Sequence, residues 1–311
     1  MVKKLVLWMT VLLLTLPVCF AEGEWPELNA DGYLDSGEFV YVNAEEGLWR
    51  YVAQDLKVEI IRYVVQEPKK LTWYEAEVWS RNGVNWGMVT NIEGKHMSSS
   101  DYPYVVAQKN QTVLAINGDY AQTRYPAKDS SVGIIIRDGK VFSSRTKKGT
   151  YRGFPNLEVL ALYPDGRMEV YDSDEKTADE YLEMGVTTTL AFGPWLIRDG
   201  QMNTDNIDAL NKPNNPRTAI GMVEPGHTFA MLLEGRHKGS HGSQISFLAE
   251  RMLEKGCTVA FNLDGGQTGC MVFMGEQINV VGGSKMKNGS ARKATELLGI
   301  GTSDLVPALE K

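Results

Sequence analysis

The sequence has few cysteines, no excess of basic residues and, beyond its N-terminus, no apolar run long enough to cross a membrane. Three cysteines in 311 residues are too few for a fold framed by disulfides. The 32 basic residues against 39 acidic ones give a net charge of −7, which argues against nucleic-acid binding through a broad basic surface. Disorder is excluded because 43% of the residues are hydrophobic and only 23% are charged. What remains is a globular protein with a sizeable core.

The N-terminus has the order of a secretory signal. Lys3 and Lys4 precede an apolar run from Leu5 to Val18, and the small residues of Cys19-Phe20-Ala21 then suit a cleavage site. This order predicts a cleaved signal peptide over residues 1–21 and a secreted or extracytoplasmic protein, with an uncleaved anchor as the alternative. Cleavage removes two lysines and no acid, so 30 basic residues face 39 acidic ones and the net charge becomes −9.

The first part of the chain predicts strands. Apolar and polar residues alternate over residues 56–65 and 72–79, which is typical of half-buried strands. Residues 22–50 show no sustained period and are interpreted as a lead-in segment. Residues 51–110 are then expected to form an N-terminal β-rich extension.

The later part combines hairpins with one clear helix. Asp138-Gly139, Asp165-Gly166 and Asp199-Gly200 each follow an apolar run and predict hairpin turns. Apolar residues fall on one face of a helix between Ser243 and Lys255. A helix among strands predicts an α+β fold, with a mixed β-sheet core, few helices and several β-hairpins. The main domain is expected over residues 111–303.

Four predicted strands stop at polar corners that contain glycine. Each corner alone is an ordinary turn sequence, but together they place carboxylates and guanidinium groups on rigid supports. The corners are Asn117-Gly118-Asp119, the segment from Pro216 and Arg217 to Gly221, Glu234-Gly235-Arg236, and Asn262-Leu263-Asp264-Gly265-Gly266.

These corners, with Phe192-Gly193-Pro194 and an Arg292 segment that ends in Gly299-Ile300-Gly301, resemble the phosphodiester glycosidase family in order and spacing. The resemblance covers about residues 55–303 and implies a catalytic domain over residues 111–303. It implies an exported hydrolase that cleaves sugar-1-phosphodiesters, such as N-acetylglucosamine-1-phosphodiesters, at the anomeric carbon. Cell-envelope or exopolysaccharide metabolism is the expected setting. The expected partner is a phosphorylated-sugar small molecule or polymer, with no nucleic acid and no membrane beyond the signal peptide.

The resemblance, read with the chemistry, assigns roles to the corner residues. An oxocarbenium-like transition state normally needs two carboxyl groups, for which Asp264 is the expected nucleophile or base, Glu234 its partner and Asp119 a third candidate. The remaining assignments concern substrate binding: Arg217, Arg236 and Arg292 hold the phosphate, Asn117 and Asn262 bond sugar hydroxyls, Gly265 and Gly266 offer main-chain N–H groups, and Thr268 offers a hydroxyl. For Glu234 an ion pair with a strand-end arginine is the alternative, and for Asn262 a turn-forming side chain.

No cofactor is expected, although carboxylate-rich corners at Asp119 or Asp264 would also suit a divalent cation such as Ca²⁺. His237 and His241 are interpreted as polar loop histidines and not as zinc ligands.

Two departures from the family pattern leave other functions open. Glu234 stands where the family usually has aspartate, and Gln267-Thr268-Gly269 stands where it typically has Gly-Ser-Ser. A non-catalytic glycan- or polymer-binding module on the same fold is one alternative. A sugar transferase in polysaccharide assembly is another.

Overall fold

The computed structural model describes residues 26–119, 133–145, 157–210 and 214–309. The predicted signal peptide at residues 1–21 lies outside the described residues. Within those ranges, no helix is both long enough and apolar enough to pass through a bilayer.

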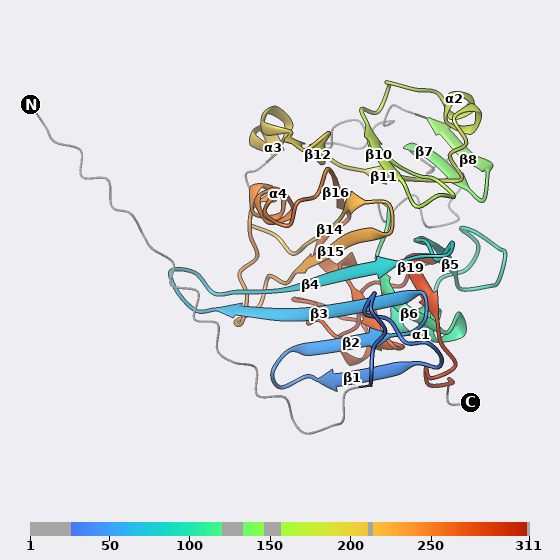
Figure 1. The fold of residues 1–311 in the computed structure, drawn as a ribbon. Coiled ribbons are helices and arrows are strands. Elements are labelled where there is room, and N and C mark those ends of the chain that lie inside the picture. The colour runs from blue at the N-terminus through green and yellow to red at the C-terminus, as the bar shows by residue number, and fades with distance from the viewer. Residues whose placement is uncertain (1–25, 120–132, 146–156, 211–213, 310–311) are drawn as a thin grey trace, which may run out of the picture.

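Two antiparallel sheets dominate the fold (Figure 1). The larger has nine strands in the order β1 (Phe39–Asn43), β2 (Leu48–Val52), β3 (Leu56–Val65), β4 (Leu71–Ser80), β15 (His227–Leu233), β14 (Arg217–Glu224), β16 (Val259–Leu263), β12 (Trp195–Arg198) and β13 (Gln201–Met202). The second has five strands in the order β18 (Glu276–Gln277), β17 (Met271–Phe273), β6 (Thr112–Ile116), β19 (Glu296–Thr302) and β5 (Gly87–Thr90).

Two smaller sheets and four helices complete the described structure (Figure 1). The sheets are β10 (Met168–Tyr171), β9 (Glu158–Leu162) and β11 (Thr188–Phe192), and the pair β7 (Gly133–Arg137) and β8 (Lys140–Arg145). The helices are α1 (Pro103–Lys109), α2 (Ala178–Glu183), α3 (Thr204–Leu210) and α4 (Ile245–Glu254).

The two large sheets pack face to face and are covered by helices on their outer faces. Alternation along each strand sends one set of side chains between the sheets, where Ile60 and Phe261 meet Leu114. The opposite set of the nine-stranded sheet packs against Leu248 and other apolar residues of α4. Helix α1 covers the outer face of the five-stranded sheet in the same way. The result is a helix–sheet–sheet–helix arrangement.

Several sequence expectations are confirmed. The expected strand at residues 56–65 is β3, and the expected helix between Ser243 and Lys255 is α4. All three Asp-Gly pairs connect paired strands. The α+β character is present, with β-structure in excess and four short helices in the described part of the chain.

Other expectations are wrong. A mixed sheet was expected, but every strand pair in the described ranges is antiparallel, as hairpin connections favour. The lead-in at residues 22–50 contains β1 and the start of β2, a hairpin at the edge of the nine-stranded sheet. Residues 51–110 are not set apart as an extension, because β4 pairs with β15 and β5 pairs with β19.

Candidate active site

Three neighbouring strands in the middle of the nine-stranded sheet, β15, β14 and β16, have ends that lie side by side. Strand β14 lies between β15 and β16 and runs antiparallel to both, so its first residues face their last ones. Arg217 is opposite Leu233, and Thr218 is opposite Leu263. The corners that follow Leu233 and Leu263 therefore lie on either side of Arg217.

Glycines allow these corners to pack backbone against backbone. A Cβ on Gly235 would lie 2.9 Å from the Pro216 nitrogen, and one on Gly265 would overlap the Pro216 carbonyl oxygen. The N–H of Gly265 donates to Asp264 Oδ1 at 2.9 Å, and that of Gly266 donates to the Pro216 oxygen at 3.0 Å. Both N–H groups that were expected to meet an anion are thus already bonded within the protein.

Asn117, which follows β6, connects the Asp264 corner to the five-stranded sheet by hydrogen bonds. Its side chain is fully buried. Its Nδ2 donates to the Asp264 carbonyl oxygen at 2.6 Å, while its Oδ1 accepts from Thr218 Oγ1 at 2.8 Å and the Cys270 N–H at 3.0 Å. This geometry makes Asn117 a positioning residue, because full burial keeps its amide from the sugar hydroxyls it was expected to bond.

Two arginines lie together beside the Asp264 corner. Arg217 Nε donates to the Ser243 oxygen at 3.0 Å, and Arg236 Nη2 donates to Asn215 Oδ1 at 2.7 Å. Arg236 Nη1 lies 3.2 Å from the place a Cβ of Gly266 would occupy. Burial, and to a lesser extent the positive charge of Arg236, lower the pKa of Arg217 to about 10. A bound anion would offset both effects.

Arg292 and Thr268 adjoin the same corner. The N–H of Arg292 donates to the Gln267 oxygen at 2.8 Å, which places Arg292 beside the helical turn Gly266–Thr268. The N–H of Thr268 donates to the Gly265 oxygen at 3.1 Å, and the residue is buried. The expected arginine cluster thus has Arg217 and Arg236 at its centre, with the backbone of Arg292 anchored nearby.

Glu234 is a buried carboxylate with three neighbours. Only 3% of the residue is exposed. Its Oε1 accepts from the Tyr74 hydroxyl at 3.2 Å and the Val280 N–H at 2.6 Å, and its Oε2 lies 3.1 Å from His237 Nε2, an ion-pair distance. Because the Gly239 N–H donates to His237 Nδ1, the proton of a neutral ring is on Nε2 and faces Glu234.

This environment corrects two expectations about Glu234. Its ion-pair partner in the described structure is a histidine and not a strand-end arginine. Burial raises the pKa of Glu234, while the hydrogen bond from Val280, the nearby His237 ring and the hydrogen bond from Tyr74 oppose that rise. The carboxylate fastens the segment at Val280, so direct contact with a substrate would require that segment to move.

Asp119 belongs to a buried ion network away from the arginines. It is fully buried, pairs with the Arg137 guanidinium and accepts from the Ala191 N–H at 2.6 Å. Arg137 lies 2.6 Å from Glu296, which in turn lies 3.0 Å from His96. Burial alone would raise the pKa of Glu296, but Arg137 and His96 lower it to about 2. The expected catalytic role of Asp119 does not fit this enclosed position.

Asn262 and Glu158 lie on the other side of the Asp264 corner. Asn262 Nδ2 donates to the Gly193 oxygen at 2.7 Å, and its Oδ1 is buried without a hydrogen-bond partner in the described structure. A Cβ on Gly193 would lie 2.9 Å from Glu158 Cβ. The Glu158 carboxylate accepts from the Trp195 N–H and from Asn206 Nδ2, the latter at 3.1 Å. Burial raises its pKa to about 7.

Sequence reasoning missed Glu158 because no motif marks it. Its partners Trp195 and Asn206 are 37 and 48 residues further along the chain. His237 was confirmed as a loop residue, but its contact with Glu234 was not foreseen. Across the described ranges, no three His, Cys, Asp or Glu side chains gather as metal ligands.

A family model described as phosphodiester glycosidase matches residues 110–300. The chain belongs to the phosphodiester glycosidase family. The match includes every corner described above, from Asn117 to Arg292. A curated relative, the SPbeta prophage-derived uncharacterized protein YomE of Bacillus subtilis (strain 168), is 29% identical over 176 residues. That alignment covers 56% of this chain but only 26% of the relative's length, so this chain spans about a quarter of that protein.

Solved structures share the fold. The catalytic domain of zebrafish N-acetylglucosamine-1-phosphodiester alpha-N-acetylglucosaminidase, auto-inhibited by its pro-peptide, matches with a TM-score of 0.60 and 18% identity. That match covers 79% of this chain and 83% of the zebrafish chain. A hypothetical protein from Synechocystis matches with a TM-score of 0.53 and 11% identity, over 80% of this chain and 62% of its own. At these identities the likeness establishes the fold.

Proposed function

We propose that this protein is an exported hydrolase that cleaves sugar-1-phosphodiesters at the anomeric carbon, in cell-envelope or exopolysaccharide metabolism. N-acetylglucosamine-1-phosphodiesters are the proposed substrates, in keeping with the name of the zebrafish enzyme that shares its fold. The observation that carries the proposal is the position of two arginines, Arg217 and Arg236, against the glycines of the Asp264 corner.

The two arginines suit a phosphodiester. A guanidinium group presents several N–H donors in one plane and binds phosphate oxygens in pairs. Arg217 is held by Ser243 and Arg236 by Asn215, so both groups are oriented before the ligand arrives. Since the positive charge of Arg236 disfavours the charged form of Arg217, an anion bound beside both groups would gain more than it would beside an isolated arginine.

Asp264 is the proposed nucleophile or base. It attacks the anomeric carbon or takes a proton from the attacking water, and the bond between that carbon and the phosphate oxygen breaks. The bonding electron pair leaves with the phosphate as a phosphomonoester. With Asp264 as base, the attacking water gives the free sugar directly; with Asp264 as nucleophile, water hydrolyses the covalent glycosyl-enzyme and releases the sugar. A phosphate leaving group is already acidic, so it needs less help from a proton donor than an ordinary alkoxide does.

Glu158 is our candidate for the second carboxyl group, in place of Glu234. It packs on Gly193, whose carbonyl holds Asn262, two residues before Asp264. Its raised pKa of about 7 keeps much of it protonated near neutral pH, as a proton donor requires. Glu234, by contrast, lies beneath the segment that it bonds at Val280.

Asp264→Asn tests the proposal. With the methyl phosphodiester of α-N-acetylglucosamine as substrate, we expect the variant to lose at least about a hundredfold in kcat while it still binds N-acetylglucosamine-1-phosphate. Arg217→Ala should instead lose binding of that phosphate. Glu183→Gln, which changes an exposed carboxylate at the end of α2, is the control and should behave as wild type.

The same assay separates the alternatives. Wild-type protein that binds the phosphodiester without turnover would support a binding module. Release of the phosphomonoester only when an acceptor sugar is added, with the transferred sugar joined to that acceptor, would support a transferase.

A further inference from the structure

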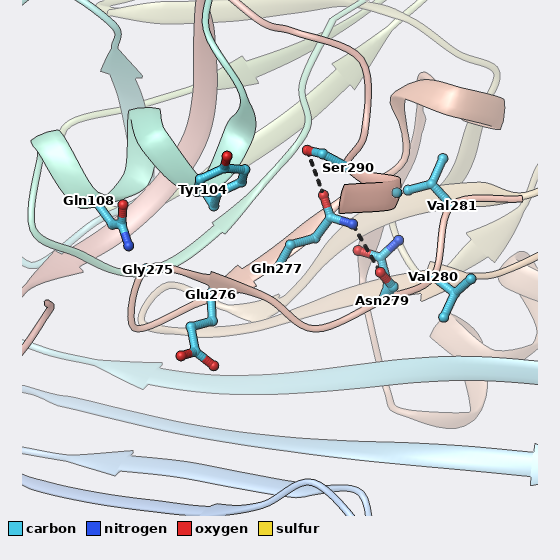
Figure 2. Close-up of a pocket in the computed structure, with 10 residues that line it drawn as sticks. Tyr104, Gln108, Gly275, Glu276, Gln277, Asn279, Val280, Val281 and Ser290 are labelled. Carbon is cyan, nitrogen blue, oxygen red and sulfur yellow. Dashed lines mark hydrogen bonds between the residues drawn. The ribbon is translucent and has the colours of Figure 1, made fainter. Parts of the chain in front are cut away.

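A cavity lies beside the segment around Val280, whose N–H bonds Glu234. It has a volume of about 450 Å³ and is lined by α1 on one side and by residues 275–290 on the other (Figure 2). Small-molecule sites in proteins commonly have volumes of about 300–1,000 Å³. The cavity is therefore large enough for one or two sugar rings.

The wall made by residues 275–290 is rigid. Gln277 Oε1 accepts from the Ala291 N–H at 2.9 Å and from Ser290 Oγ at 3.3 Å. Gln277 Nε2 donates to the Asn279 oxygen at 3.0 Å, and Asn279 Oδ1 accepts from the Met271 N–H at 2.9 Å. Figure 2 shows Gln277 joined to Ser290 and Asn279 across this wall. Asn279 Nδ2 donates to the Gly269 oxygen at 3.2 Å, so each of the two amide nitrogens makes one of these bonds and carries a second hydrogen.

The helical wall offers polar groups that are not engaged. Tyr104 and Gln108 are one turn apart on α1 and project from the same face toward the cavity (Figure 2). Within the described residues, neither the Tyr104 hydroxyl nor the Gln108 amide has a hydrogen-bond partner. The Tyr104 ring stacks on Tyr102 with centroids 5.7 Å apart and planes 9° apart, which fixes its orientation.

The chemistry of the lining selects a neutral ligand. Amide and hydroxyl groups dominate the polar part, and among the described residues neither lysine nor arginine lines the cavity. Within the same ranges Glu276 is the one carboxylate of the lining, and its side chain points away from Tyr104 and Gln108 in Figure 2. Phosphate would require guanidinium or ammonium groups, whereas sugar hydroxyls pair with amides and sugar C–H faces suit a tyrosine ring.

The cavity also adjoins the candidate active site. The segment that forms its rigid wall continues into contacts with that site. Val280 N–H bonds Glu234 at 2.6 Å, the Gly283 oxygen accepts from Gln267 Nε2 at 2.6 Å, and Arg292 N–H bonds the Gln267 oxygen. One face of this segment thus meets the active site while the other lines the cavity.

We propose that this cavity is a binding site for a neutral saccharide, separate from the site that holds the phosphodiester. The proposal does not depend on catalysis, because it rests on the lining and not on Asp264. The protein would then contact a glycan at a second point, on the side of residues 275–290 that faces away from the candidate active site.

Calorimetric titration with neutral N,N′-diacetylchitobiose and maltose, and with glucose 6-phosphate as the anionic probe, tests the site. We expect at least one neutral disaccharide to bind and glucose 6-phosphate not to bind in this cavity. Gln108→Ala and Tyr104→Ala should each weaken binding by about fivefold or more, the equivalent of one lost hydrogen bond. Lys109→Ala, an exposed neighbour on the same helix, is the matched control and should bind as wild type.

Arg217→Ala distinguishes the cavity from the active site, since neutral-saccharide binding should survive that change. Binding that is lost in Arg217→Ala and unchanged in Gln108→Ala would overturn the proposal. So would the absence of binding by both neutral probes, with circular dichroism showing each variant folded.

Discussion

Asn117→Ala is expected to be among the most damaging single changes near the active site. The fully buried amide makes hydrogen bonds of 2.6, 2.8 and 3.0 Å with Asp264, Thr218 and Cys270. Its removal leaves three buried polar groups without a partner. At about 1–1.5 kcal/mol for each, the free energy of unfolding should fall by roughly 3–5 kcal/mol. In a domain of this size, that loss lowers Tm by about 10 °C.

Urea unfolding followed by circular dichroism measures the change in free energy. Gln201→Ala is the control, because this amide is exposed on edge strand β13 and should alter stability by less than about 0.5 kcal/mol. Asn117→Asp keeps the acceptor and replaces the donor that faces the Asp264 carbonyl oxygen, so it should still lose turnover. A loss below about 1 kcal/mol in Asn117→Ala would refute the inferred anchoring role.

Three further predictions concern charge and close packing. Hydrogen bonding to Glu296, and then to Asp138, raises the pKa of His96 despite its burial, so the protonated ring stabilises the fold fully below its unfolded value of about 6.5. That stability is lost as pH rises through the raised pKa. The urea midpoint of His96→Gln should therefore approach that of wild type at high pH. A difference between the two midpoints that stays constant with pH would contradict this. Burial raises the pKa of Glu158 to about 7, so the neutral Glu158→Gln variant should gain stability relative to wild type as pH rises from about 4.5 to 7, and a flat difference would argue against the buried environment. Gly265→Ala forces a Cβ into the Pro216 carbonyl oxygen, so turnover should fall together with Tm. Gly139→Ala is the control, because its Cβ meets nothing within 4 Å; it introduces only the strain of a positive φ and should retain turnover.

Local patterns predicted much of the fold. Strand β3 follows the alternation of Leu56, Val58 and Ile60, which is the period of a strand with one buried face. The hairpin of β1 and β2 was missed because β1 has no such alternation; one of its five residues is exposed and none is buried. Its place is set by pairing with β3, a tertiary contact that local sequence does not carry.

For the candidate site, too, the sequence predicted one part and not another. The corners at Arg217, Glu234 and Asp264 were predictable, because glycines and polar residues mark the ends of apolar strands. Which corner side chains face a ligand was not predictable. Asn117 and Asp119 carry suitable functional groups, yet packing between the sheets encloses both. Burial depends on contacts between distant segments, so the same residue types serve as supports in one place and as reactive groups in another.

Cleavage in water enriched in oxygen-18 tests the central claim most directly. Wild-type protein is incubated with the methyl phosphodiester of α-N-acetylglucosamine, and the products are resolved by phosphorus-31 NMR and mass spectrometry. We expect methyl phosphate without the heavy isotope and N-acetylglucosamine that carries it at the anomeric carbon. Heavy oxygen in the phosphate would show attack at phosphorus and contradict cleavage at the anomeric carbon.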